Sequence, residues 1–183
     1  MASPRNLSPR TAPAFTLLEL LAVLAIVALL AGFVLGSGRR ATESAKGVRA
    51  RAELAALAAA LESYRRAYGD YPQTGDAARL LQSLLGRLGP AGAAVNGRTL
   101  LETGRFTTTD GSDPVANAAA ELADPWGRPY VYTYKSPPAG WLNPGFVLYS
   151  VGPDGTGAPG LLGGGWIDTA APANADNIYA NRN

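Results

Sequence analysis

After a short polar stretch, the chain contains one long apolar run. Residues 15–38 read FTLLELLAVLAIVALLAGFVLGSG and include a single charged side chain, Glu19. At roughly 1.5 Å per residue, a helix over this run is about as long as the hydrocarbon core of a bilayer is thick. The run therefore predicts one membrane-spanning helix, which ends before Arg39 and Arg40. Basic residues also precede the run, so the distribution of positive charge leaves the orientation open.

Two apolar rows recur at helical spacing in residues 39–69. The first row consists of Ala41, Ala45, Val48, Ala52, Ala55 and Ala59, and the second of Leu54, Leu57, Leu61, Tyr64 and Tyr68. We expect both rows to form one broad apolar face of an amphipathic helix, because charged residues lie among the remaining positions. This helix should continue the membrane helix without a break and end at Gly69 and Pro72.

Shorter patterns follow in residues 70–183, which we expect to form a globular head on the distal part of the long helix. The leucines of residues 77–88 recur at helical spacing and predict a short helix. Asp113 and Pro114 are typical of a helix N-cap and first turn, and they predict another short helix. Between these segments glycine and threonine are frequent, and no clear period is present.

Two segments of the head alternate in the manner of β-strands. Residues 129–135 place tyrosines at every second position, at 130, 132 and 134, and residues 145–151 read GFVLYSV. We expect an antiparallel pair with one face on the long helix, followed by loop from Gly152 onward. The predicted fold class is α+β.

Composition narrows the possible functions. The chain has 183 residues, and its formal net charge is only +2, so no strong basic field indicates nucleic-acid binding. It contains no cysteine and no histidine, which excludes disulfides, thiolate chemistry, imidazole catalysis and the usual zinc sites. We therefore expect no enzymatic activity, and any metal ion must be bound by oxygen atoms.

Glu19 is the unusual residue of the apolar run. A carboxylate in a membrane helix costs up to a few kcal/mol, less near the interface, so it normally has a charged or polar partner. The preceding residues 1–14, MASPRNLSPRTAPA, carry two arginines, three prolines and no acidic residue. This composition predicts a leader segment that is removed.

The stretch FTLLELLAVLAIVALLAGF resembles the N-terminus of prepilins and pseudopilins, in which a short basic leader precedes a phenylalanine and a glutamate stands fifth from it. Phe15 and Glu19 match these two positions. The resemblance implies cleavage by a prepilin peptidase between Ala14 and Phe15, methylation of the new amino group on Phe15, and neutralisation of a neighbouring subunit's N-terminus by Glu19. Ala14 stands where the family usually has glycine.

Three further blocks, YRRAYGDYPQTGDAARLL, DPWGRPYVYTY and FVLYSVGPDG, resemble in that order the motifs of the major pseudopilin of type II secretion systems, general secretion pathway protein G. With the N-terminus they cover a little over half of the chain. The resemblance implies a type IV pilin-like lollipop fold, in which a long N-terminal helix carries a small antiparallel sheet and a C-terminal loop. Residues 89–113 depart from the family pattern as an insertion.

The function implied by this resemblance is structural. Such a subunit polymerises into a periplasmic pseudopilus that drives folded proteins across the outer membrane. Its partners would be copies of itself, minor pseudopilins, the prepilin peptidase, an inner-membrane assembly platform with its ATPase, and membrane lipid before assembly. The chain would cross the bacterial inner membrane once, with its head in the periplasm.

In this family the C-terminal loop binds a calcium ion through aspartates and backbone carbonyls. The matching positions here are Asp154 and Asp176, with Asn177 beside the latter, and Ser150 and Val151 could add carbonyl oxygens. These are the hard oxygen ligands that Ca²⁺ prefers. A third acidic residue, Asp168, is a weaker candidate. The alternative is that Asp154 only forms a turn and Asp176 is solvated.

Three other interpretations stay open at this point. A type IV pilin of a surface filament, used for adhesion, motility or DNA uptake, shares the N-terminus, although such pilins frequently carry a C-terminal disulfide. The tyrosines of residues 129–135 could instead bind glycans by stacking, in a membrane-anchored binding module. Asp124 and Arg128 could belong to an active site, but a turn at DPWG is the simpler interpretation.

Overall fold

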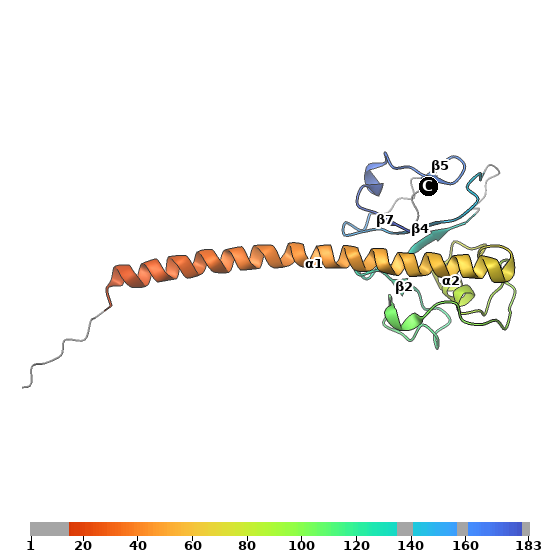
Figure 1. Cartoon of the computed structure of the whole chain (residues 1–183), viewed down its shortest axis with the longest axis horizontal. Helices are drawn as coiled ribbons and strands as arrows, with labels where there is room; N and C mark the ends of the chain where they lie inside the picture. Colours follow the sequence, from red (N-terminus) through yellow and green to blue (C-terminus); the bar gives the residue numbers. More distant parts are fainter. Residues whose placement is uncertain (1–14, 135–140, 157–160, 181–183) are drawn as a thin grey trace, which may run out of the picture. The chain divides into compact units, whose positions relative to one another are not determined.

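The computed structural model describes residues 15–134, 141–156 and 161–180, and within α1 it leaves out the side chains of residues 33–39. The chain divides into two compact units, Met1–Thr42 and Glu43–Asn183. Helix and small antiparallel sheets are both present, so the predicted class, α+β, is confirmed (Figure 1).

Helix α1, Leu17–Tyr68, is one uninterrupted helix of 52 residues, as predicted. It begins after Thr16, whose hydroxyl accepts a hydrogen bond from the backbone N–H of Glu19 at 3.2 Å. It ends at Gly69, which has a φ of +85° and donates its N–H to the carbonyl of Arg65 at 2.7 Å. A left-handed residue after the last helical turn is a common helix terminus, and glycine adopts it without a steric penalty.

The two apolar rows of α1 differ in burial, which corrects the prediction of a single broad face. Leu54, Leu57, Leu61 and Tyr64 are at most 1% exposed, and Tyr68 is half-buried. The small-residue row is exposed at all six positions, Ala41, Ala45, Val48, Ala52, Ala55 and Ala59. The reason is geometric: successive residues turn by about 100°, so two rows offset by one or two positions lie about half a turn apart.

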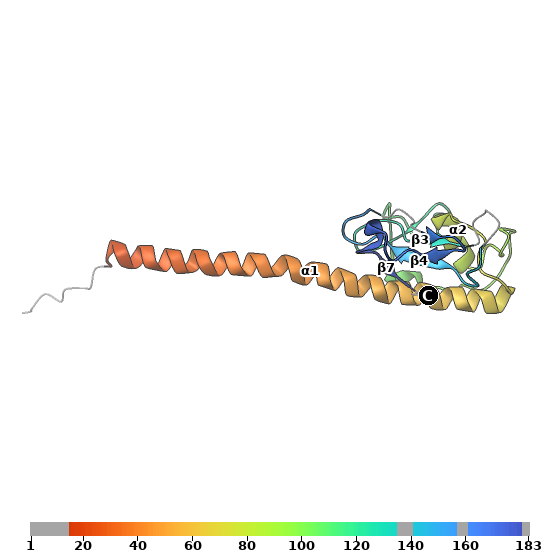
Figure 2. The same ribbon diagram turned by 90° about the horizontal axis from the view of Figure 1, so that it is seen from above.

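The predicted pair of strands is confirmed with shorter limits. Strand β3, Val131–Thr133, is antiparallel to β4, Val147–Ser150, and Tyr132 pairs with Leu148 (Figure 2). A third strand, β7, Ile178–Tyr179, pairs with the other edge of β4. This strand corrects the prediction that the chain from Gly152 onward is loop.

The alternating tyrosines attach β3 to α1 and to the segment that follows α1. Tyr130, Tyr132 and Tyr134 are each at most 5% exposed. The hydroxyl of Tyr130 donates to Glu53 at 2.5 Å, that of Tyr132 to the carbonyl of Pro72 at 2.9 Å, and that of Tyr134 to Asp70 at 2.5 Å. Burial raises the pKa of Tyr130 and of Tyr132. A buried row offers no stacking surface, so the glycan-binding interpretation loses its basis.

Strand β4 is buried on both faces. Leu148 belongs to the main core, which α1, α2 and the tyrosines also form, whereas Val147 and Tyr149 belong to a smaller second core. Trp141, together with the β5–β6 hairpin, covers this second face. The hairpin consists of β5, Leu161–Leu162, and β6, Trp166–Ile167.

Helix α2, Ala77–Leu84, is shorter than the predicted helix 77–88. Asp76 is its N-cap and accepts a hydrogen bond from the N–H of Arg79 at 2.8 Å. Gly86 has a φ of +75°, which a right-handed helix cannot accommodate, so the remaining predicted turn does not form.

The predicted helix after Asp113 is a turn only. Its carboxylate accepts hydrogen bonds from the N–H groups of Val115 at 2.7 Å and Ala116 at 3.2 Å, as an N-cap would. The Asn117 side chain then bonds Asp110 and Ser112, and the backbone leaves the helical path. Asparagine competes with helix formation through such local bonds.

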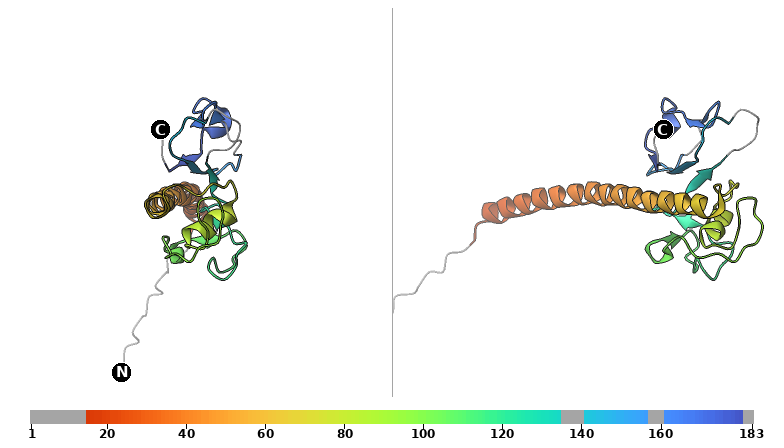
Figure 3. Two further views of the ribbon diagram at one scale, coloured as in Figure 1. Left: turned by 90° about the vertical axis from the view of Figure 1, so that its right-hand side faces the viewer. Right: turned by 45° about the vertical axis from the view of Figure 1, so that its right-hand side comes forward.

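The remaining short elements lie on two sides of α1. A single turn of 3₁₀ helix, η1, Thr103–Arg105, precedes the hairpin of β1, Thr107–Thr108, and β2, Leu122–Ala123. In Figure 3 this green segment lies on the opposite side of α1 from η2, Pro172–Asn174, drawn in blue.

The burial of α1 predicts unequal effects of two substitutions on the same helix. Leu54→Ala should lower the free energy of unfolding by about 2–5 kcal/mol, because it leaves a cavity in the main core. Val48→Ala should cost less than about 0.5 kcal/mol, because Val48 is 61% exposed. Urea denaturation of the full chain in detergent, followed by circular dichroism, measures both. Equal losses would contradict the assigned face.

Candidate functional site

The first turn of α1 carries the predicted processing and assembly residues. Phe15 is 78% exposed, and Glu19 is exposed as well. The Glu19 carboxylate lies at the positive end of the helix macrodipole, which favours a negative charge there. Within the described part of the chain it forms no hydrogen bond or ion pair. Ala14 and the predicted leader, residues 1–14, lie outside the described residues.

Exposed apolar side chains lie on all sides of α1 around and after Glu19. Leu17 and Leu18 are 78% and 80% exposed. The other large exposed residues of this segment are Leu20, Leu21, Val23, Leu24, Ile26, Val27, Leu29 and Leu30. A continuous apolar surface of this kind normally belongs to an interaction site, because water disfavours it.

Among the residues that the structure describes, no helix combines the length and the mean hydropathy required to span a membrane. The predicted membrane run, 15–38, includes the positions from 33 onward whose side chains lie outside the description.

The C-terminal loop brings together the residues that the calcium prediction named. The backbone N–H of Asp154 donates to Oδ2 of Asp176 at 3.0 Å. Gly152 has a φ of +69°, and a Cβ at this position would lie 2.4 Å from the carbonyl oxygen of Asp176. Only glycine therefore allows these two segments to approach so closely.

Two oxygen atoms at this point have no partner in the described residues. Oδ1 of Asp176 and Oδ1 of Asn177 are both buried without a hydrogen bond. Asn177 is 6% exposed, and its amide group donates to Asn174 at 3.0 Å and to the Tyr179 hydroxyl at 3.2 Å. Buried acceptors without a donor are unfavourable, so these atoms fit a bound cation with hard oxygen ligands.

The other predicted ligands are engaged elsewhere. The Asp154 carboxylate is exposed and accepts from the side chain of Thr156 at 2.6 Å and from its N–H at 2.7 Å. These bonds hold the pKa of Asp154 below its usual value. The Asp168 carboxylate accepts from the N–H of Ala170 at 3.0 Å.

The candidate cation site is therefore small. In the ranges that the structure describes, no three acidic side chains come together as a metal-binding group. The donor set would consist of Asp176 and Asn177, with backbone carbonyls at Ser150 and Val151, where β4 ends. Calcium binding stays a prediction.

Asp124 connects the DPWG turn to this loop, which the sequence analysis missed. It is 1% exposed, and its Oδ1 accepts from the N–H groups of Trp126 at 2.9 Å and Arg128 at 3.0 Å. Its Oδ2 accepts from the hydroxyl of Ser150 at 2.5 Å. In the described residues, these Asp124 contacts are structural, in agreement with the turn interpretation. The signal in the sequence was an aspartate at the first position of a tight turn.

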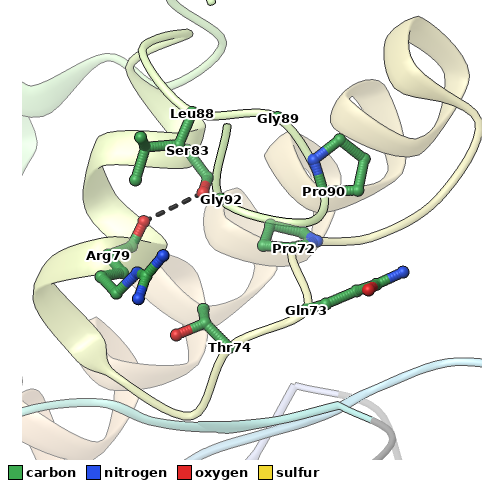
Figure 4. Close-up of a pocket in the computed structure, with 9 residues that line it drawn as sticks. All are labelled: Pro72, Gln73, Thr74, Arg79, Ser83, Leu88, Gly89, Pro90 and Gly92. Atoms are coloured by element: carbon green, nitrogen blue, oxygen red, sulfur yellow. Dashed lines mark hydrogen bonds between the residues drawn. The ribbon is translucent and has the colours of Figure 1, made fainter. Parts of the chain in front are cut away.

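A small pocket near the start of α2 is too small for an organic ligand (Figure 4). It has room for about one water molecule. Ser83 donates its hydroxyl hydrogen to the carbonyl of Arg79 beside it at 3.0 Å. Its lining residues are Pro72, Gln73, Thr74, Arg79, Ser83, Leu88, Gly89, Pro90 and Gly92.

No protein-family model, curated protein or solved structure matches this chain.

The Asp124 contacts predict a graded loss of stability. Asp124→Ala leaves two N–H groups and one hydroxyl without their acceptor, at about 1–3 kcal/mol for each buried group. Asp124→Asn keeps the acceptor for the N–H groups, and its amide can donate to the Ser150 hydroxyl, so the loss should be clearly smaller. Urea denaturation of the full chain measures both variants. Equal losses would argue against the assigned contacts.

Proposed function

We propose that this protein is a structural subunit that polymerises into a pilus-like filament, of the pseudopilin kind found in type II secretion systems. The observation that carries the proposal is the first part of α1, where apolar side chains are exposed on all sides and one carboxylate has no partner in the described residues. Such a helix needs apolar surroundings, which the residues described in the structure do not provide there.

Copies of the same helix would supply these surroundings. Leu17, Leu18 and the apolar residues after them would first lie in lipid and then against the helices of neighbouring subunits. The exposed small-residue row from Ala41 to Ala59 extends the packing surface, because small side chains let two helices approach closely.

Glu19 would provide charge neutrality in this packing. Removal of the leader would create a positively charged amino group on Phe15. A carboxylate of one subunit opposite this group of the next forms an ion pair, which offsets the cost of holding either charge in apolar surroundings. The exposure of Phe15 and Glu19 supports this role, because both are free to meet another chain.

The head would be the part of the subunit outside the membrane, on the periplasmic side. Pilins of a surface filament would use the same N-terminal helix. The DPWG and GPDG motifs favour the secretion branch, and the absence of cysteine in the sequence agrees with it. The minor pseudopilins, prepilin peptidase, assembly platform and ATPase remain the partners implied by this proposal.

A calcium ion in the C-terminal loop is a further part of the proposal. The Oδ1 atoms of Asp176 and Asn177, which have no hydrogen-bond partner in the described residues, support it. When bound, the ion would neutralise Asp176 and hold the last strand, β7, to the end of β4.

Assembly predicts a cross-link that depends on Glu19. The sequence has no cysteine, so Ala52→Cys places a single thiol on the exposed row of α1. Mild oxidation of membranes that contain the assembly machinery should give disulfide-linked dimers, detected by non-reducing electrophoresis. Adding Glu19→Ala should abolish them, because the amino group of the next subunit loses its partner. Glu102→Cys, on the exposed head, is the control for random collision.

N-terminal sequencing of the same membrane-extracted protein should begin at Phe15. A start at Met1, or cross-linking that is unchanged by Glu19→Ala, would overturn the filament proposal.

The calcium proposal predicts a metal-dependent melting temperature. Calcium at a hundredfold excess over its Kd should stabilise the full chain by about 2.7 kcal/mol, because only the folded loop binds it. Thermal melts in CaCl2 and in EGTA measure this shift. Asp176→Ala and Asn177→Ala should remove it, whereas Asp168→Ala should retain it, since that carboxylate is bonded elsewhere. A wild-type chain with equal melting temperatures would eliminate the site.

A further inference from the structure

The loop Gly152–Gly155 is held by a positive charge from another part of the chain. Nη1 of Arg128 donates a hydrogen bond to the carbonyl of Gly152 at 2.6 Å. Arg128 itself is fixed by its backbone, because its N–H donates to Asp124 at 3.0 Å and its carbonyl accepts from the N–H of Asp124 at 2.7 Å. The guanidinium therefore reaches the loop from a turn that these backbone hydrogen bonds hold in place.

The loop is shaped to receive this side chain. Gly155 has a φ of +70°, and a Cβ there would lie 2.3 Å from Cζ of Arg128 and 2.5 Å from Nη2. The guanidinium thus lies directly against the backbone of Gly155, and any residue with a Cβ at this position would clash with it. Gly152 is packed against Asp176 in the same way, because a Cβ there would clash with that residue. The two glycines of GPDG therefore admit a cationic group at one end of the loop and a carboxylate at the other.

The charge of Arg128 acts on the acidic residue between these glycines. The hydrogen bonds from Thr156 lower the pKa of Asp154 most, and attraction by Arg128 adds to the lowering. In the described residues, Oδ1 of Asp176 and Oδ1 of Asn177 accept no hydrogen bond from the guanidinium, so a metal ion could bind these atoms while Arg128 stays in place. Both cationic groups would act on one short loop.

We propose that Arg128 is a built-in cation of this loop, which keeps Gly152–Gly155 in its folded shape without metal and weakens calcium binding. The inference rests on the proposed calcium site and adds its regulation. Two positive charges on one short loop repel each other, so the loop gains less from a metal ion while Arg128 is present. A hydrogen bond to the Gly152 carbonyl also withdraws a potential ligand oxygen from the ion.

The alternative is that Arg128 only braces the loop by its hydrogen bond. Arg128→Gln separates the two possibilities, because glutamine keeps an N–H donor and removes the charge. Arg128→Lys keeps the charge and is the conservative variant. Arg105→Gln, an exposed arginine 3.6 Å from Glu102, is the matched control for loss of one positive charge.

The experiment titrates the full chain in detergent with CaCl2 by calorimetry and records thermal melts in EGTA. Arg128→Gln should bind calcium about tenfold more tightly than the wild type, because a repulsive charge is gone. It should melt at a lower temperature in EGTA, and CaCl2 should restore the loss. Arg128→Lys and Arg105→Gln should keep the wild-type Kd.

Equal Kd values for Arg128→Gln and the wild type would overturn the inference, as would a melting temperature that falls equally in EGTA and CaCl2. If Arg128→Gln does not fold, Arg128→Lys still decides, because a Kd that differs from the wild type contradicts a charge effect. If no variant binds calcium, the inference fails, while the Ala52→Cys cross-link tests the filament proposal independently.

Discussion

The attachment of β3 to the distal part of α1 is the interaction on which the head depends. The three alternating tyrosines in and beside β3 are buried in the main core, and each hydroxyl donates a hydrogen bond to an acceptor on α1 or just after it. Burial of three aromatic rings supplies most of the driving force, and the hydroxyl bonds set the register, because a slip of one residue would turn the tyrosines away from their acceptors.

This attachment places the remaining strands and the candidate cation loop. Strand β4 pairs with β3 and ends at Ser150, whose hydroxyl reaches Asp124 in the turn that precedes β3. The loop after β4 is therefore bounded by the Asp124 turn on one side and by Asp176, before β7, on the other. Its geometry is a consequence of strand register, and local sequence preferences alone would not produce it.

Periodicity predicted the long helix and the β3–β4 pair, because both show a regular pattern along the sequence. It failed where the outcome depends on distant contacts: the row at Ala41–Ala59 is as apolar as a core face, but the described residues of the head leave it exposed. Gly86 and β7 show the same limit, since a positive φ and a two-residue strand have no period. Asp154 and Asp176 were paired through the family resemblance, whereas Asp124 and Arg128 act through side-chain bonds that no spacing reveals.

The two hydrophobic cores of the head contain no residue before Leu54 among the described positions, and their side chains come from the distal part of α1 and from the chain after it. The apolar surface from Leu17 to Leu30 is thus not an unfinished part of the head's core. A chain that completes its own cores and still exposes such a helix favours an external apolar environment, and a single carboxylate in its first turn favours one that also contains a charged or polar partner. In the proposed filament, a second copy of the same chain with a free amino group on Phe15 would provide both.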